Sequence, residues 1–131
     1  MRKVVSFGIF SVVVAAAFSA SAQDYDRYGH ALISDAEGWV YVDRNQRPLI
    51  RPYIFDNGPD YFEEGLARFV KDGKMGFHDK ALNIVIPARY DFVFPFQDGA
   101  AKAGTNCRRE RASEHTSVYC EKWESLSKPE Q

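Results

Sequence analysis

Three histidines are the first residues to consider as acid/base groups. They are His30, His78 and His115, and His78 is followed directly by Asp79. A histidine beside a carboxylate can act as a general base, so His78 with Asp79 and Asp43 forms one candidate catalytic group. The spacing brings no nucleophile to this group. The alternative for His78 is a structural position in a β-strand, on the face opposite to the aromatic side chains.

The acidic segment 56–64 is a second candidate site. It contains Asp56, Asp60, Glu63 and Glu64, and such oxygen ligands bind Ca²⁺ or supply the carboxylates of a hydrolase. The alternating ligand spacing of a calcium loop is missing, however, and Asp-Asn-Gly-Pro-Asp at residues 56–60 is typical of a turn. The chain also lacks Gly-x-Ser-x-Gly and His-Glu-x-x-His motifs. We therefore predict no catalytic residue, no metal and no cofactor.

Cys107 and Cys120 are the two cysteines of the chain. In an oxidising compartment such a pair is expected to form a disulfide. The bond would close a loop of about a dozen residues and stabilise the fold by roughly 3 kcal/mol in the chain-entropy model. Two free thiols or a metal-binding pair are the alternatives, although no histidine lies at a zinc-like spacing from both cysteines.

The N-terminus predicts export. Basic residues at positions 2 and 3 precede an apolar run, Val4–Phe18, and small residues follow at positions 20–22. This order is typical of a secretory signal peptide, and we expect cleavage after Ala22. The apolar run is shorter than the roughly 20 residues that span a bilayer. A soluble periplasmic or extracellular protein without a membrane span is therefore expected.

The charge balance argues against nucleic-acid binding. Residues 1–22 hold two of the 17 basic residues and none of the 18 acidic ones, which leaves 15 basic and 18 acidic residues in the remaining 109. This length suits one domain, and nucleic-acid-binding domains usually show a basic excess. The arginines at positions 108, 109 and 111 form a local cluster, partly offset by Glu110 and Glu114, and are expected to lie in a solvated loop.

Short β-strands are expected through the rest of the chain. Alternating aromatic and β-branched residues suit a pleated surface, and they occur at 38–43, 48–56, 66–70, 74–79, 84–86 and 90–94. Asp72-Gly73 is a strong hairpin signal. Residues 23–36 are predicted to be an N-terminal leader with one short helix or strand. A terminal helical turn is expected only near Glu121–Leu126.

The strand pattern occurs twice. Two groups of positions match at an offset of 36 and a third group at 34, and the two-residue difference falls in the loop around 57–60, where insertions are easily tolerated. The matching groups are Tyr41-Val42-Asp43 with Phe77-His78-Asp79, Leu49-Ile50 with Val85-Ile86, and Phe62, Gly65 and Ala67 with Phe96, Gly99 and Ala101. Asp43 and Asp79 recur just before a turn, where a carboxylate can accept hydrogen bonds from turn amides.

This repeated pattern resembles the WG-repeat family. It is carried by Gly38–Asp43, by Ile86–Asp91 and by the two glycine positions of the third group, while Met75 stands where the family has tryptophan. The resemblance covers about residues 37–104 and implies stacked short strands and hairpins, without catalytic residues. We predict an all-β fold of short antiparallel strands from two WG-like repeats, followed by a disulfide-stapled C-terminal segment, 105–131.

The abundance of aromatic residues suggests a binding surface. Most of them must fill the core of a thin β-layer, and the remainder can form an exposed patch of the kind that binds partners. Tyr53, Phe55, Tyr61 and His78 are the candidate binding residues. We expect a non-enzymatic interaction module for a protein or glycan partner. A small hydrolase, and an inhibitor or immunity-type protein that blocks a secreted partner through the Cys107–Cys120 loop, are the alternatives.

Overall fold

The computed structural model describes residues 24–130. The predicted signal peptide and its cleavage site lie outside the described residues. All regular elements of the described part are β-strands, which confirms the all-β prediction. Within residues 24–130 there is no helix of the length and apolar character needed to cross a bilayer.

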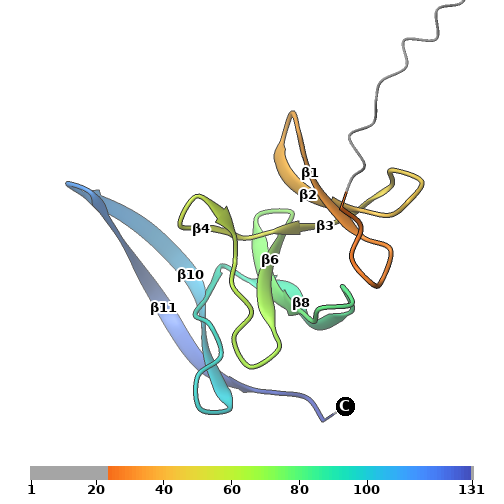
Figure 1. The fold of residues 1–131 in the computed structure, drawn as a ribbon. Coiled ribbons are helices and arrows are strands. Elements are labelled where there is room, and N and C mark those ends of the chain that lie inside the picture. The colour runs from red at the N-terminus through yellow and green to blue at the C-terminus, as the bar shows by residue number, and fades with distance from the viewer. Residues whose placement is uncertain (1–23, 131) are drawn as a thin grey trace, which may run out of the picture.

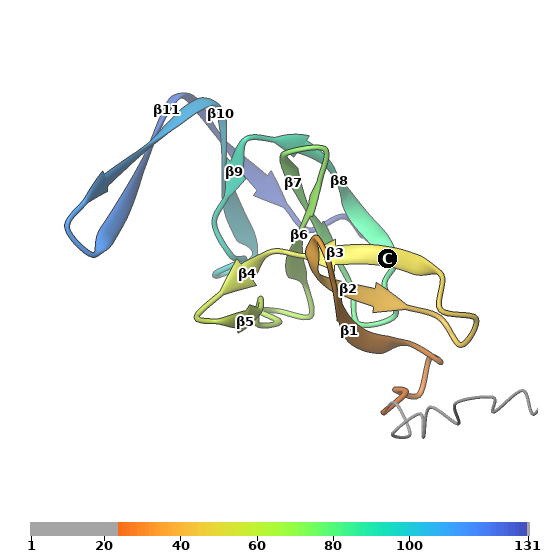
Figure 2. The ribbon, with the colours of Figure 1, turned by 90° about the horizontal axis from the view of Figure 1, so that it is seen from above.

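Eleven strands form three antiparallel sheets (Figures 1 and 2). The six-stranded sheet has the order β1-β2-β3-β6-β7-β8, the three-stranded sheet has the order β11-β10-β9, and β4 pairs with β5. The strands are β1 (Ala31–Asp35), β2 (Gly38–Val42), β3 (Pro48–Pro52), β4 (Ile54–Phe55), β5 (Gly58–Pro59), β6 (Ala67–Lys71), β7 (Lys74–His78), β8 (Ile84–Tyr90), β9 (Phe92–Val93), β10 (Ala100–Ala112) and β11 (His115–Ser127).

Asp43 and Asp79, at the repeated turn position, accept the same pattern of hydrogen bonds. Asp43 Oδ1 accepts backbone N–H bonds from the residues two and four positions later, at 2.8 and 3.0 Å. Asp79 Oδ1 makes the same pair of bonds at 3.0 and 2.8 Å. Each carboxylate thereby satisfies turn amides that have no strand partner, and the predicted turn role of both residues is confirmed.

The tight turns are also repeated. Asp72 and Gly73 have φ angles of 52° and 75°, as required at both centres of the turn that best fits a hairpin, and they join β6 to β7 as predicted. Gly65 and Gly99 have φ angles of 80° and 81° at matching positions. Gly29 has the same φ of 80°, and it lies 36 residues before Gly65.

The segment expected to be a leader therefore continues the repeat. Gly29 is followed two residues later by Ala31, as Gly65 is by Ala67, and Ala31 and Ala67 are both buried. The strand after each alanine forms a hairpin with the next strand, β1 with β2 and β6 with β7. The repeated structure therefore begins before residue 37, where the sequence predicted its start.

The larger core cluster lies under the second repeat. Phe77 is fully buried and contacts Phe96 with ring centroids 4.7 Å apart. Gly76, next to Phe77 in β7, is required by the close approach of β8, because a Cβ there would overlap the backbone of Ile86 and Pro87. A smaller cluster around Val40 and Val42 lies under β1 and β2.

Strands β10 and β11 form a long hairpin, here called the arm, that projects from the six-stranded sheet (Figures 1 and 2). The predicted helical turn at Glu121–Leu126 is wrong, because these residues pair along β10. The arginines at 108, 109 and 111 are exposed, as expected, but they lie in β10 and not in a loop. In both segments, pairing between the two strands outweighs the weak local preference for a helical turn or a loop.

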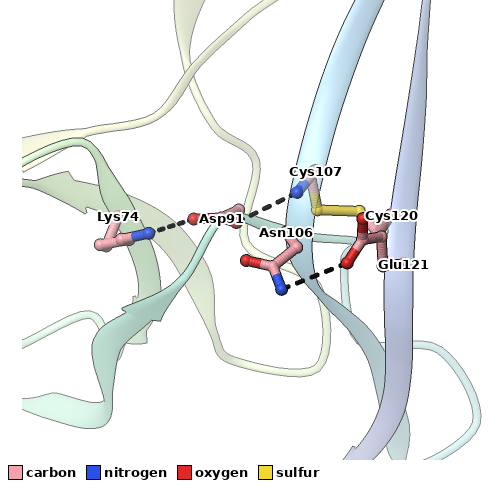
Figure 3. The surroundings of a disulfide bond; sticks show 6 residues. All are labelled: Lys74, Asp91, Asn106, Cys107, Cys120 and Glu121. Carbon is pink, nitrogen blue, oxygen red and sulfur yellow. Dashed lines mark hydrogen bonds and ion pairs between the residues drawn. A yellow bond between two sulfur atoms is a disulfide. The ribbon is translucent and has the colours of Figure 1, made fainter.

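The predicted disulfide is present. Cys107 lies directly opposite Cys120 in the arm, with Cα atoms 3.9 Å apart, and the two sulfur atoms are bonded (Figure 3). Gly104 makes room for the bond, since a Cβ at that position would overlap the Cys120 sulfur. The disulfide therefore fixes the register of the arm at the point where it leaves the body.

Asp91 connects the arm to the six-stranded sheet (Figure 3). Its Oδ1 forms an ion pair with Lys74 of β7, and its Oδ2 accepts a hydrogen bond of 3.1 Å from the Cys107 backbone N–H. The Lys74 ammonium and then the Cys107 N–H lower the pKa of Asp91 from its ordinary value. The Asp91 carboxylate thus fixes the position of the arm relative to the six-stranded sheet.

Candidate functional site

Three of the four candidate binding residues line one cavity. Tyr53 follows β3, Phe55 lies in β4 and Tyr61 follows β5, and the cavity between them and the arm has a volume of about 420 Å³. We call this cavity the aromatic groove. Its walls are formed on one side by Tyr53, Phe55, Tyr61, Phe92, Phe94 and Pro95, and on the arm side by Arg109, Thr116 and Val118.

The groove exposes aromatic rings to solvent. Phe55 is 48% exposed, Tyr61 is 57% exposed and Phe94 is 44% exposed. The rings of Phe55 and Tyr61 meet edge to face, with centroids 6.1 Å apart. Large apolar side chains gathered at one hollow are a typical binding surface.

A buried ion pair forms the floor of the groove. Asp60 and Arg68 have side chains that are each only 4% exposed. Asp60 Oδ2 accepts bonds of 2.9 Å from both the backbone N–H and Nε of Arg68, and Oδ1 accepts one of 2.8 Å from Nη2. The guanidinium also donates to the Val93 carbonyl oxygen at 3.1 Å. Its charge is therefore neutralised and its position is fixed.

The same guanidinium supports the aromatic wall. Arg68 lies 4.5 Å from the ring centroid of Tyr53 and 5.7 Å from that of Phe55. A cation over an aromatic face is attracted by the ring. Arg68 thus holds two of the rings, one partly buried and one exposed, in the positions that shape the groove.

His78 lies away from the groove. It is 1% exposed, and its ring meets Tyr41, Phe62 and Phe69 edge to face at centroid distances of 5.9, 5.5 and 6.1 Å. The expectation that its face of the sheet lacks aromatic side chains is wrong, because both faces of this thin sheet are filled with rings.

The hydrogen bonding of His78 fixes its protonation. Nδ1 is 2.7 Å from the Asp79 carbonyl oxygen, which can only accept, so Nδ1 carries the proton. Nε2 is buried and has no hydrogen-bond partner in the described part of the chain. Burial lowers the pKa of His78 from its ordinary value. The imidazole is therefore neutral, and it is part of the core.

The acidic side chains of segment 56–64 do not form one cluster, although Asp60 and Glu63 both line the groove. Asp60 is paired with Arg68, Glu64 accepts a bond of 3.0 Å from the Gly99 backbone N–H, and Asp56 accepts one of 3.4 Å from the Tyr61 hydroxyl. Among residues 24–130, no group of three His, Cys, Asp or Glu side chains is placed to hold a metal ion. The convergence that a hydrolase would need at these residues is absent from the described chain.

A second, larger hollow adjoins the aromatic groove. It has a volume of about 900 Å³ and shares Glu63, Phe94 and Pro95 with the groove. On its arm side, Trp123 stacks on Phe94 with centroids 5.7 Å apart, and Lys102 Nζ lies 4.8 Å from the Trp123 ring. Phe94 therefore joins the two hollows into one aromatic surface along the base of the arm.

Sequence reasoning missed Phe94, Trp123 and Arg109 as site residues. Phe94 belongs to a recognisable strand pattern at 90–94, but the sequence does not tell whether its ring lies in the core or in an exposed patch. Trp123 and Arg109 reach the site only because residues 100–127 form the arm. The one available signal was the cysteine pair, which places the two halves of the arm opposite each other.

Comparison with protein families identifies the repeat. The family model described as WG containing repeat matches the chain twice, at residues 39–74 and 75–106. Comparisons with curated proteins and with solved structures gave no match. The two matched segments cover more than half of the chain and coincide with the repeated turns and strands described above. This chain belongs to the WG containing repeat family.

Proposed function

We propose that this protein is a non-enzymatic binding module, and that the aromatic groove is its binding surface for a protein or glycan partner. The observation that carries the proposal is the convergence of Phe55, Tyr61 and Phe94, all strongly exposed, on one hollow. A monomeric domain leaves such rings in water at a cost of free energy, and a partner that covers them recovers it.

The floor of the groove supports binding more than chemistry. Arg68 and Asp60 neutralise each other and have almost no exposed surface, so neither is available as an acid, a base or an anion site. Their fixed geometry instead pre-organises the rings above them. Pre-organised surfaces lose little conformational entropy when a partner binds.

The groove combines family and chain-specific parts. One wall comes from the repeats, at residues 53–61 and 92–95. The other comes from Arg109, Thr116 and Val118 of the arm, which all lie after residue 106, the last residue matched by the family model. We infer from this division that the repeats supply the scaffold of the groove and that the arm determines its specificity.

The experiment compares paired substitutions. Phe55→Ala with Tyr61→Ala removes the exposed rings, and Leu49→Ala with Ile84→Ala removes equally apolar side chains, 43% and 52% exposed, outside the groove. Peptide and oligosaccharide panels are screened against the wild-type protein by NMR. The groove variant should bind a hit about 30-fold more weakly, since loss of aromatic anchors costs about 2 kcal/mol. Equal losses in both variants would refute the assignment of the groove.

An inhibitor role through the arm is the second candidate. The observation in its favour is the shape of the arm, whose residues from Arg108 to Tyr119 are almost all exposed and project from the sheet. A rigid projection with a disulfide at its base suits insertion into a partner's cleft. Replacing Ser113 and Glu114, in the turn at its end, by alanine should then abolish partner inhibition and leave ligand binding in the groove unchanged.

We also propose that the protein is exported. The Cys107–Cys120 bond supports this, because disulfides persist in oxidising compartments and are rare in the cytosol. Expression of the whole chain in a secreting bacterial host, followed by mass spectrometry of the product, tests it. The mass should correspond to a chain that starts at Gln23 with an intact disulfide. A product that retains residues 1–22 would contradict the proposal.

A further inference from the structure

One edge of β10 has no strand beside it over half its length. β11 pairs with β10 from end to end, but β9 pairs only with Ala103 and Gly104 on the other side. Beyond Gly104, no strand in residues 24–130 pairs with that second edge. Unpaired backbone groups of this kind are a template for an additional strand.

The direction of the free backbone groups is defined by Cys107. Its N–H points away from β11, because it donates to the Asp91 carboxylate on the β9 side. Backbone groups alternate along a strand, so those of Arg109 and Arg111 point to the same side. An added strand therefore finds N–H and C=O groups at these two residues.

The free edge borders the aromatic groove. Arg109 lies opposite Val118, and Arg111 lies opposite Thr116, and three of these four residues line the groove. A strand placed about 4.8 Å from β10 would continue the line of β9. Every second side chain of that strand would face the groove, beside Arg109 or over the exposed rings.

The charge of the edge selects the occupant. Arg108 is paired with Glu110 at 3.2 Å, whereas Arg109 and Arg111 have no ion-pair partner among residues 24–130. Directly opposite side chains on paired strands interact, and like charges there are destabilising. The edge therefore repels a second copy of itself and favours acidic side chains.

We propose that the β10 edge from Arg108 to Ala112 binds an extended acidic peptide as an added antiparallel strand, whose groove-facing side chains are acidic opposite Arg111 and Arg109 and apolar near Phe94. The proposal rests on the proposed function, since it names the partner class of the same groove. Main-chain hydrogen bonds supply affinity in this mode, and alternate side chains supply specificity.

The test uses the full disulfide-bonded protein and the capped peptide Thr-Glu-Thr-Glu-Thr-Phe-Thr. In antiparallel orientation its two glutamates face Arg111 and Arg109, and its phenylalanine faces the groove. Binding should slow hydrogen exchange of the Arg109 and Arg111 amides at least tenfold and weaken as salt rises. The reversed sequence, and a version with lysine for glutamate, should bind at least tenfold more weakly.

Two further changes isolate the backbone contribution. In the first, the peptide is N-methylated at every second residue, on the amides that would face β10. This keeps the side chains but removes the backbone N–H donors, and it should weaken binding about tenfold. Arg109→Pro removes an N–H that β11 does not use, with Arg109→Ala as its matched control, and only the proline variant should lose amide protection at Arg111. Near-ultraviolet circular dichroism checks that both variants fold.

The outcomes distinguish strand addition at β10 from ligand binding in the groove by any other mode. Peptide binding that tolerates amide methylation but is lost in the Phe55→Ala, Tyr61→Ala variant would overturn strand addition and support the groove. Oligosaccharide binding without peptide binding would do the same. Absence of peptide binding, with no groove ligand found in either panel, would overturn both.

Discussion

Removal of the Asp60 carboxylate should be among the most damaging single changes in this protein. Asp60→Ala deletes the acceptor of three hydrogen bonds from Arg68 and leaves that guanidinium 4% exposed, with one remaining bond to the Val93 carbonyl. A buried charge that loses its partner costs about 3–5 kcal/mol. Small domains have a free energy of unfolding of only about 5–15 kcal/mol, so a large part of the total is at stake.

The expected effect is measurable in two ways. A change of 1 kcal/mol shifts the melting temperature of a domain this size by about 4–5 °C, so Asp60→Ala should lower it by roughly 12–25 °C. The urea midpoint should fall in proportion, with an unchanged m-value. Circular dichroism follows the first and intrinsic fluorescence the second.

A double-mutant cycle distinguishes the ion pair from general core damage. Asp60→Leu with Arg68→Met replaces both charges by apolar side chains, a change that is often neutral or stabilising for buried pairs. The double variant should therefore be more stable than either single variant by about 2 kcal/mol or more. Additive losses, or an Asp60→Ala variant within about 0.5 kcal/mol of the wild type, would refute the reasoning.

Three other changes test the rest of the fold. Replacing Cys107 and Cys120 by serine should lower the free energy of unfolding by about 3 kcal/mol, measured by urea denaturation, because the bonded positions are 13 apart in the sequence. His78→Val, which copies Val42 of the first repeat, should remove a pH dependence. Since the buried imidazole has a lowered pKa, the unfolded chain takes up a proton below about pH 6.5 that the folded chain does not, so wild-type stability should fall on acidification from pH 7.5 to 5.5 and the variant should change less. Gly76→Ala should broaden or abolish cooperative unfolding, because its Cβ would overlap the Ile86 backbone, whereas Gly58→Ala, with open space around it, should stay close to the wild type.

The repeats were readable from the sequence because their signals are local. Asp43 and Asp79 bind amides only two and four residues away, and Asp72-Gly73 encodes its own turn. The arm was not readable for the opposite reason. Most of residues 105–127 is exposed on both faces, so no alternation of apolar and polar side chains marks the strands. Their register depends on a disulfide and on pairing across the chain.

The burial of His78 was hidden for a related reason. Alternation along β7 correctly separates His78 from Phe77, but it does not show what covers the second face. That face is closed by Phe69 of the adjacent strand β6, by Tyr41 of the more distant strand β2 and by Phe62 from the loop between β5 and β6. Contacts between separate elements, and not the periodicity of one strand, decide whether a polar side chain is buried.

The arm is an extension of the repeat itself, and this explains why it forms a groove with the sheet. Three hairpins of the fold pair equivalent positions, with Ser34 opposite Trp39, Val70 opposite Met75 and Gly104 opposite Trp123. The first two hairpins turn within four residues, whereas the third continues from Thr105 to Lys122 before the chain returns.

Because Trp123 occupies the pairing position of Trp39 and Met75, the base of the arm follows the repeat geometry and the remainder projects past it. A projection fixed by Asp91 and the disulfide must then stand beside the loop of the previous repeat, at residues 53–61. The aromatic groove is the space between an elongated hairpin and the unit before it, so a single lengthened hairpin adds a hollow lined by exposed aromatic rings to a structural repeat.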